Sequence, residues 1–98
     1  MRYNFEWDPT KAKQNLRLHQ VSFERATTIF RDRLMLSVFD EEHSGDEARW
    51  TTIGSDESGI LLVVSHTLRE HSATLWTIRI ISARKATKKE RQQYEEKP

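Results

Sequence analysis

Apolar and polar residues alternate at the start of the chain, where Tyr3, Phe5 and Trp7 are separated by polar side chains. This period of two predicts a short β-strand with one buried face. Asp8 and Pro9 come next, and such a pair often begins a helix, because the carboxylate accepts from first-turn amides and proline lacks an amide there. We therefore predict a strand over residues 3–7, followed by a helix that ends near residue 19.

The hydrophobic spacing changes to three and four in the next segment. Phe23, Ala26 and Phe30 fall on one side of a helix with this period. Ser22 stands directly before them, and serine is among the residues preferred at the N-cap. The pattern predicts a second helix that begins after Ser22 and packs through this apolar stripe.

From residue 34 onward the period of two returns. The predicted strands cover residues 34–39, 49–54, 60–66 and 75–81, with polar connections between them. The third of these is almost continuously apolar, which indicates a central strand that is covered on both faces. Thr87 and Glu90 have the spacing of a capping box and predict a final helix.

These elements follow one another in the order β-α-α-β-β-β-β-α. We predict a single α+β domain over residues 1–98, with a mostly antiparallel sheet and helices packed on one face. No apolar run is long enough to cross a membrane, and the first residues lack the apolar core of a secretory signal. We expect a cytoplasmic protein without membrane association.

The composition narrows the chemistry that the chain can perform. It contains no cysteine, which excludes disulfides and thiolate zinc sites. Its four histidines lack the spacing of a helical zinc site, and its three glycines form no phosphate-binding loop. We therefore predict no metal and no cofactor. The net charge of +1 hides a division, because acidic residues gather over 40–47 and basic residues over 79–91.

The basic segment is the first candidate site. Arg79 falls on the face of its predicted strand opposite to Ile78 and Ile80, which we assign to the core. A guanidinium matches two phosphate oxygens, and a helix N-terminus attracts anions, so the strand-to-helix junction is a candidate phosphate site. The alternative is a solvated basic surface that pairs with the acidic loop. The other cations of this junction are Arg84, Lys85, Lys88 and Lys89.

The loop before the predicted strand at 49–54 is the second candidate site. RNA cleavage without a metal requires a base for the 2′-hydroxyl, an acid for the leaving 5′-oxygen and cations around the phosphorus. His43, Glu47 and Arg49 supply these three types within seven residues. Triples of this kind also occur by chance in charged loops, and the alternative is an exposed connection without chemistry.

Two further groups of polar residues have a less specific interpretation. Lys11, Asn15 and His19 lie at intervals of four and form one polar line along the first helix. This line is either an RNA-facing stripe or the solvated side of an amphipathic helix. His66 is expected to point outward from a strand end, and His71 to lie in a turn.

The chain resembles the BrnT family across nearly its whole length, in three ordered blocks: FEWDPTKAKQNLRLHQVSFERATTIF, DEEHSGDEARWTTIG and RIISARKATKKERQQYEE. The resemblance implies a RelE-like fold and a ribonuclease toxin that cleaves RNA and arrests translation. It also implies neutralisation by a BrnA-type antitoxin that binds DNA and represses its own operon. Gln20 departs from the family pattern, which usually has glycine there to end the helix in a left-handed conformation.

The resemblance selects the candidate active surface. We expect Arg79 and Arg84 to bind the scissile phosphate, Glu47 or His43 to exchange protons, and Arg49 to stabilise charge or orient Glu47. The expected RNA-binding residues are Lys11, Asn15, His19, Lys85, Lys88 and Lys89.

The partners also follow from the resemblance. We expect RNA as the substrate and a DNA-binding antitoxin as the protein partner, in a hetero-oligomer that reaches operator DNA only through the antitoxin. The rival hypothesis is a module that binds nucleic acid or a partner without catalysis.

Overall fold

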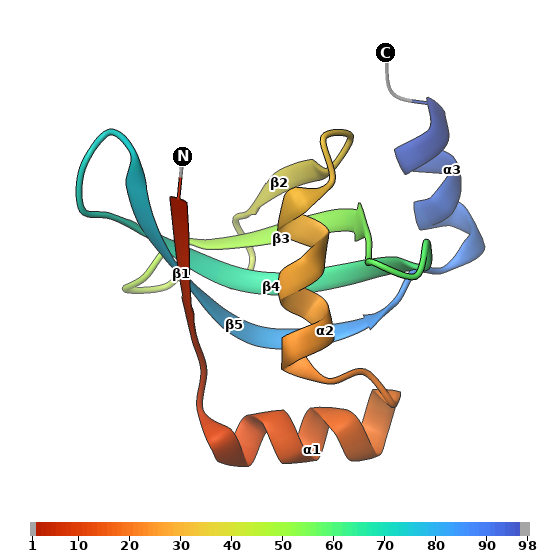
Figure 1. The fold of residues 1–98 in the computed structure, drawn as a ribbon, viewed down its shortest axis with the longest axis horizontal. Helices are drawn as coiled ribbons and strands as arrows, with labels where there is room; N and C mark the ends of the chain where they lie inside the picture. Colours follow the sequence, from red (N-terminus) through yellow and green to blue (C-terminus); the bar gives the residue numbers. More distant parts are fainter. Residues whose placement is uncertain (1, 97–98) are drawn as a thin grey trace.

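The computed structural model describes residues 2–96 and confirms the predicted element order (Figure 1). Within this range the chain forms five strands, three α-helices and one 3-10 turn, in the following order. They are β1 (Arg2–Glu6), α1 (Pro9–His19), α2 (Phe23–Thr27) with the 3-10 turn Thr28–Arg31, β2 (Leu36–Asp40), β3 (Arg49–Ser55), β4 (Leu61–Glu70), β5 (Leu75–Lys85) and α3 (Lys88–Glu96).

The strands form one mixed sheet in the order β1-β5-β4-β3-β2. The last four strands pair antiparallel with their sequence neighbours, whereas β1 pairs parallel with β5. The expectation of a mostly antiparallel sheet is therefore corrected to a mixed one. Strand periodicity indicates which face of a strand is buried, but it does not indicate which strand is its neighbour. The neighbour of β1 is β5, the last strand in the sequence.

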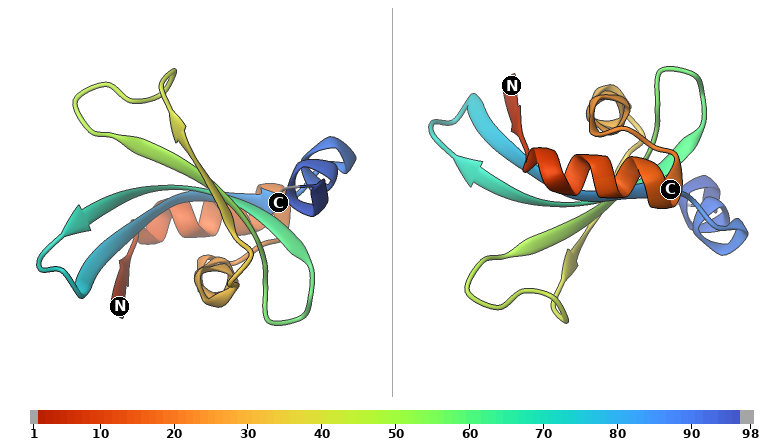
Figure 2. Two further views of the ribbon diagram at one scale, coloured as in Figure 1. Left: turned by 90° about the horizontal axis from the view of Figure 1, so that it is seen from above. Right: turned by 90° about the horizontal axis from the view of Figure 1, so that it is seen from below.

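The helices cover the sheet unequally. In Figure 1, α2 crosses one face of the sheet, α1 runs along its β5 side, and α3 lies beyond its end. The two views of Figure 2 place α3 beside the sheet and away from α1 and α2. The core lies between α2 and the sheet, where Phe23, Ile29, Leu62, Ile78 and Ile80 are almost completely buried. We call the opposite sheet face the open face, and it carries polar side chains together with the buried apolar residues Ile53 and Val63.

The predicted helix caps are confirmed. The Asp8 carboxylate accepts from the amide of Thr10 at 2.8 Å, and Pro9 occupies the first turn. Thr87 and Glu90 exchange reciprocal hydrogen bonds of 3.2 and 2.9 Å at the beginning of α3. Helix α1 ends in the left-handed conformation at Gln20, with φ 57°, although this residue carries a Cβ atom.

Ser22 caps α2 as predicted, accepting from the amide of Arg25 at 3.0 Å. Its position places Phe23 and Ala26 inward, and both side chains are fully buried. The apolar stripe of the second helix therefore packs on the sheet, as the spacing of three and four indicated.

His66 differs from its expected position. We expected it to point outward from a strand end, but β4 continues to Glu70, and His66 lies on the same face as Leu62 and Val64. Its side chain is buried against Phe30, and its Nε2 lies 2.7 Å from the Thr52 hydroxyl. Burial lowers the pKa of His66 to about 4, so the ring is neutral near pH 7.

The two edges of the sheet differ in character. The exposed side chains of β1 are polar or charged: Arg2, Asn4 and Glu6. At the β2 edge, Val38 is 55% exposed, Phe39 is 42% exposed, and the preceding Leu34 is 62% exposed. No helix formed by residues 2–96 is long and apolar enough to span a membrane.

Candidate active site

One row of side chains crosses the open face from edge to edge. Its members pair in register, one from each strand: Glu6, Arg79, Thr67, Arg49 and Asp40. Paired side chains on the same face are neighbours, so Thr67 separates two arginines that stand on the open face. The predicted placement of Arg79 on this face is consistent with the register.

Arg84 reaches the same face through a β-bulge. Arg79 pairs with Thr67 and Arg84 with Val63, and these two partners are four residues apart in regular β4. The register between them shifts near Ser65 and His66, so β5 has one extra residue in this stretch. Because a bulge inverts the alternation that follows it, Arg84 turns to the open face and Ala83 becomes fully buried.

The loop between β2 and β3 brings Glu47 to Arg79. The carboxylate Oε1 lies 3.7 Å from the Arg79 Nη1, and the two side chains are 62% and 47% exposed. Such an exposed pair contributes little to stability. Because both side chains are exposed, both charged groups are accessible to a ligand on the open face.

The same loop holds His43 at the end of β2. Its Nδ1 lies 2.9 Å from Oδ2 of Asp40, and its amide donates to Oδ1 of the same carboxylate at 3.2 Å. Ser44 donates through its hydroxyl to the Asp40 carbonyl and accepts from the amide of Arg49 at 2.9 Å. These bonds join the end of β2 to the beginning of β3 and fix the position of the imidazole between them.

His43 and Arg84 line one hollow of about 450 Å³. It lies between the end of β2, the middle of β3 and the first turns of α3, and it is the largest of the hollows that we describe. Its walls combine apolar strand residues with charged ones: Val38, Phe39, Asp40, Glu42, His43, Thr51, Ile53, Arg84, Glu90 and Gln93.

Arg84 is held in this hollow by α3. Its guanidinium makes two parallel hydrogen bonds to the carboxylate of Glu90, at 2.7 and 2.9 Å. This pairing raises the pKa of Arg84 and lowers that of Glu90 to about 2. The Arg84 side chain is still 42% exposed, so a phosphate could approach it from the solvent side. Helix α3 has a second attachment, a hydrogen bond of 2.5 Å from Tyr94 to Asp32.

The predicted RNA-binding residues do not form one surface. Lys11 and His19 line a hollow of about 240 Å³ between α1 and β5, together with Ile81 and Ser82. The three lysines at the α3 junction, Lys85, Lys88 and Lys89, are exposed. Lys11 and His19 lie beside β5, whereas Lys85 ends this strand and Lys88 and Lys89 begin α3.

Asn15 belongs to the scaffold. It is 6% exposed, and its amide donates to the carbonyls of Val21 and Ala83 and accepts from the amide of Ala83. Strand β1 pairs with β5 only as far as Arg79, and Asn15 satisfies the edge of β5 beyond that point. The expectation that Asn15 contacts RNA does not fit this burial, because its side-chain groups are bonded within the protein.

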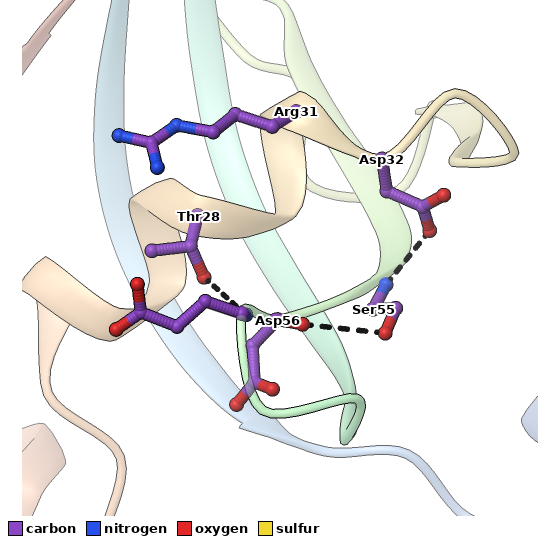
Figure 3. A pocket seen from close by; sticks show the side chains of 6 residues that line it. Thr28, Arg31, Asp32, Ser55 and Asp56 are labelled. Atoms are coloured by element: carbon purple, nitrogen blue, oxygen red, sulfur yellow. Dashed lines mark hydrogen bonds between the residues drawn. The ribbon is translucent and has the colours of Figure 1, made fainter.

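A different hollow, of about 260 Å³, lies where the 3-10 turn meets the β3–β4 connection (Figure 3). Figure 3 shows Asp32 accepting from the amide of Ser55 at its rim. Burial opposes the ionisation of Asp56, but hydrogen bonds from Arg25 and from two backbone amides outweigh it and lower its pKa. These bonds close the connection, so this hollow is explained by turn geometry.

Two residues of the site were not identified from the sequence, Asp40 and Glu90. Glu90 had been assigned only to the capping box, and the spacing of six residues from Arg84 gave no sign of contact across the strand–helix junction. Asp40 precedes His43 by three residues, the spacing that lets a carboxylate reach both the amide and the ring in a turn. Among residues 2–96 no group of three or more His, Asp and Glu side chains is arranged to hold a metal ion.

Comparison with known proteins identifies the class to which this fold and surface belong. Residues 7–90 match a family model described as "Ribonuclease toxin, BrnT, of type II toxin-antitoxin system", so the protein is a ribonuclease toxin of a type II system. The chain belongs to the BrnT family. No curated protein sequence matches it.

The fold is also found in a solved structure. The ribonuclease toxin BrnT from Brucella abortus superposes with a TM-score of 0.64, over 90% of this chain and the whole of the Brucella chain. The two sequences are 17% identical over this match. The α+β architecture with its mixed five-stranded sheet is therefore shared, while an identity of 17% assigns no role to the site residues of this chain.

Proposed function

We propose that the protein is an endoribonuclease that cleaves RNA without a metal ion, by using the groups of its open face. One observation carries the proposal: β5 and the β2–β3 loop bring arginines, a histidine and a carboxylate to the same face of the sheet. His43 and Arg84 share a hollow there, and Glu47 lies beside Arg79. These are the groups that phosphodiester cleavage requires when the protein supplies both the protons and the charge stabilisation.

The reaction is internal transesterification. The Glu47 carboxylate takes the proton of the 2′-hydroxyl while the 2′-oxygen forms a bond to phosphorus. The bond from phosphorus to the 5′-oxygen breaks, and protonated His43 gives the proton on Nε2 to that oxygen. The products are a 2′,3′-cyclic phosphate and a 5′-hydroxyl, and a proton moves from Glu47 to His43 through solvent to complete the cycle.

The arginines stabilise the charge that develops on the phosphate. Arg79 and Arg49 flank Thr67 in the row across the open face, where they bind the scissile phosphate and the charge that grows on it. Arg84 contributes from the hollow after exchange of its partner Glu90 for a phosphate oxygen. Lys11, His19 and the lysines Lys85, Lys88 and Lys89 bind the flanking RNA backbone.

We also infer that a BrnA-type antitoxin neutralises the toxin in the cytoplasm, in a hetero-oligomer that reaches operator DNA through the antitoxin. The support is membership of a type II family, which implies a proteinaceous antitoxin. A RelE-like relationship of the fold belongs to the same proposal, and the helix-backed five-stranded sheet is compatible with it.

The test is cleavage of a defined RNA by the purified protein in excess EDTA. We expect fragments with 2′,3′-cyclic phosphate ends, and a loss of about 100-fold or more in rate for Arg79→Ala, the usual scale for losing one transition-state charge contact. Lys13→Ala is the matched control, because Lys13 is an exposed cation of α1 outside the open face. Intact RNA in EDTA, with cleavage restored by a divalent metal, would contradict metal independence.

A non-enzymatic binding module is the second candidate, and the Arg84–Glu90 pair favours it, because the predicted phosphate ligand is already occupied. This candidate predicts that RNA binds with a steep salt dependence and stays intact. Cleavage by the wild-type chain that Arg79→Ala abolishes would exclude it.

A further inference from the structure

We infer that Asp40 is the positioning residue for His43, and that its carboxylate fixes which ring nitrogen faces the substrate. The inference rests on the proposed function, since it concerns the histidine that exchanges the proton. Asp40 is not one of the site residues predicted from the sequence, and its contacts with His43 indicate its role.

The carboxylate of Asp40 contacts His43 twice. Oδ2 lies 2.9 Å from the ring Nδ1, and Oδ1 accepts from the main-chain amide of His43 at 3.2 Å. A carboxylate accepts hydrogen bonds and cannot donate when ionised, so Nδ1 carries the hydrogen in this pair. Nε2 is then the nitrogen left for the substrate, and no residue within 2–96 makes a hydrogen bond to it.

The backbone around the pair holds this geometry before any ligand arrives. Ser44 links the Asp40 carbonyl to the Arg49 amide, and Asp40 and Arg49 are themselves register partners on β2 and β3. The loop therefore leaves β2 and returns to β3 over a closed turn. Asp40 is largely covered, with 22% of its side chain exposed, whereas His43 is 60% exposed and lines the hollow with Arg84.

The chemical consequence is a division of work between the two ring nitrogens. Nδ1 keeps its hydrogen on Asp40 in both protonation states, so only Nε2 gains and loses a proton. A neutral ring with its hydrogen on Nε2 would have no lone pair on that nitrogen. It could not take up the proton that it needs for the next cycle. A carboxylate behind the imidazole prevents this, as a general strategy for orienting catalytic histidines.

Asp40→Asn tests the charge of the Asp40 side chain separately from the hydrogen bond that this side chain makes in the turn. The amide oxygen can still accept from the His43 backbone, so the turn is kept, while the ionised acceptor for Nδ1 is lost. Asp46→Asn is the matched control, since Asp46 is an exposed carboxylate of the same loop outside these contacts. Circular dichroism on each variant verifies the fold.

Two readouts decide the inference. In ¹⁵N spectra of the His43 ring, assigned with His43→Gln, the neutral wild-type ring should carry its hydrogen on Nδ1, and Asp40→Asn should shift the population toward the Nε2-hydrogen form. In RNA cleavage, Asp40→Asn should lower kcat by about tenfold or more, a part of the general acid contribution, with KM changed less than about twofold. In a His43→Gln background the same substitution should have no further effect.

The inference is overturned if Asp40→Asn leaves the tautomer of His43 and kcat unchanged. It is also overturned if the loss in kcat caused by Asp40→Asn is as large in the His43→Gln background as in the wild-type chain. An equal loss in kcat for Asp46→Asn would also overturn it, because the effect would then come from the charge of the whole loop. If the wild-type chain cleaves no RNA, the proposed function fails. The ring spectra then still determine whether Asp40 fixes the tautomer.

Discussion

Arg79 and Arg84 are five residues apart in one strand, and their side chains lie on the same face of the sheet. Regular alternation would turn them to opposite faces. The extra residue that β5 carries between them, opposite Ser65 and His66 of β4, accounts for the difference. The shared face of both candidate phosphate ligands thus depends on one local irregularity, because in continuous register Arg84 would pair with the core residue Leu62 instead of Val63.

Deletion of Ile81 should remove the bulge and leave the domain folded, with Arg79 and Arg84 still on the open face. Ile81 is the extra residue of β5, so without it the pair Ser82–Ser65 follows Ile80–His66 directly, and Arg84 keeps its place opposite Val63. Thermal melts followed by circular dichroism measure the effect. Ile81→Ala keeps the residue count and serves as control; an unfolded deletion variant beside a folded Ile81→Ala would show that the fold requires the bulge itself.

Glu90→Gln should release Arg84 and reveal a trade between stability and RNA affinity. The neutral side chain can still accept from the Thr87 amide and preserve the cap, but it loses the charged bidentate pair. We expect unfolding to become easier by about 1 kcal/mol after allowance for screening at exposed Arg84. A non-cleavable RNA should bind several-fold more tightly, as measured by fluorescence anisotropy. Gln92→Ala, a neutral change at an exposed position of the same helix outside the hollow, provides the comparison. Unchanged affinity in Glu90→Gln would remove Arg84 from the RNA site.

Buried His66 should make the fold sensitive to mild acid. Its pKa is lowered from 6.5 to about 4 by burial, so the unfolded chain binds this proton more readily than the folded one. The stability from the neutral ring is complete above about pH 6.5 and is lost as the pH falls from there toward 4. The shift corresponds to on the order of 3 kcal/mol.

Urea unfolding at several pH values measures this dependence. His66→Gln should flatten it between pH 6.5 and 4, whereas His71→Gln, a substitution of an exposed histidine, should leave it unchanged. The Glu90 carboxylate, with a pKa of about 2, adds a second loss at lower pH, as the pH falls below about 4.5. The two windows are separate enough to be distinguished.

Gln20→Gly should stabilise the protein. Gln20 adopts a left-handed conformation with φ 57° at the end of α1, which costs a residue with a Cβ atom about 1 kcal/mol more than glycine. The expected gain in the free energy of unfolding is about 0.5–1 kcal/mol. Gln14→Gly, inside the same helix, should lower the free energy of unfolding. A change of the same sign in both variants would refute the explanation.

Asn15→Leu should destabilise the fold without acting through RNA. Truncating its amide leaves the Ala83 amide and carbonyl and the Val21 carbonyl without partners, at a cost of about 2–4 kcal/mol. Lys11→Ala, one turn earlier on the same helix side, should instead weaken RNA binding and leave the unfolding midpoint in place. Chemical denaturation and RNA titration of both variants separate the two roles.

Local patterns in the sequence were sufficient for the element order and the helix beginnings. Asp8, Ser22 and Thr87 act through bonds to residues two or three positions away, so the information is contained in short segments. The face of Arg79 could be predicted for the same reason, because the core residues Ile78 and Ile80 adjoin it.

Contacts between distant segments could not be predicted in this way. The parallel pairing of β1 with β5 joins residues more than seventy positions apart, and Asn15 reaches Ala83 over 68 positions. His66 was misplaced because the predicted strand ended four residues too early, which turned a central residue into a terminal one. The bulge in β5 leaves no mark in the hydrophobic pattern, since Ile80, Ile81 and Ala83 are all apolar.

The contrast between the two sheet edges has a consequence for how the chain can assemble. Only the β2 edge presents apolar side chains, Leu34, Val38 and Phe39, beside unpaired strand backbone. If two copies join there across a twofold axis, the combined ten-stranded sheet ends on both sides in β1, whose exposed side chains are Arg2, Asn4 and Glu6. Growth by edge pairing would then stop at two chains. A chain with only one apolar sheet edge is in this way protected from forming fibres.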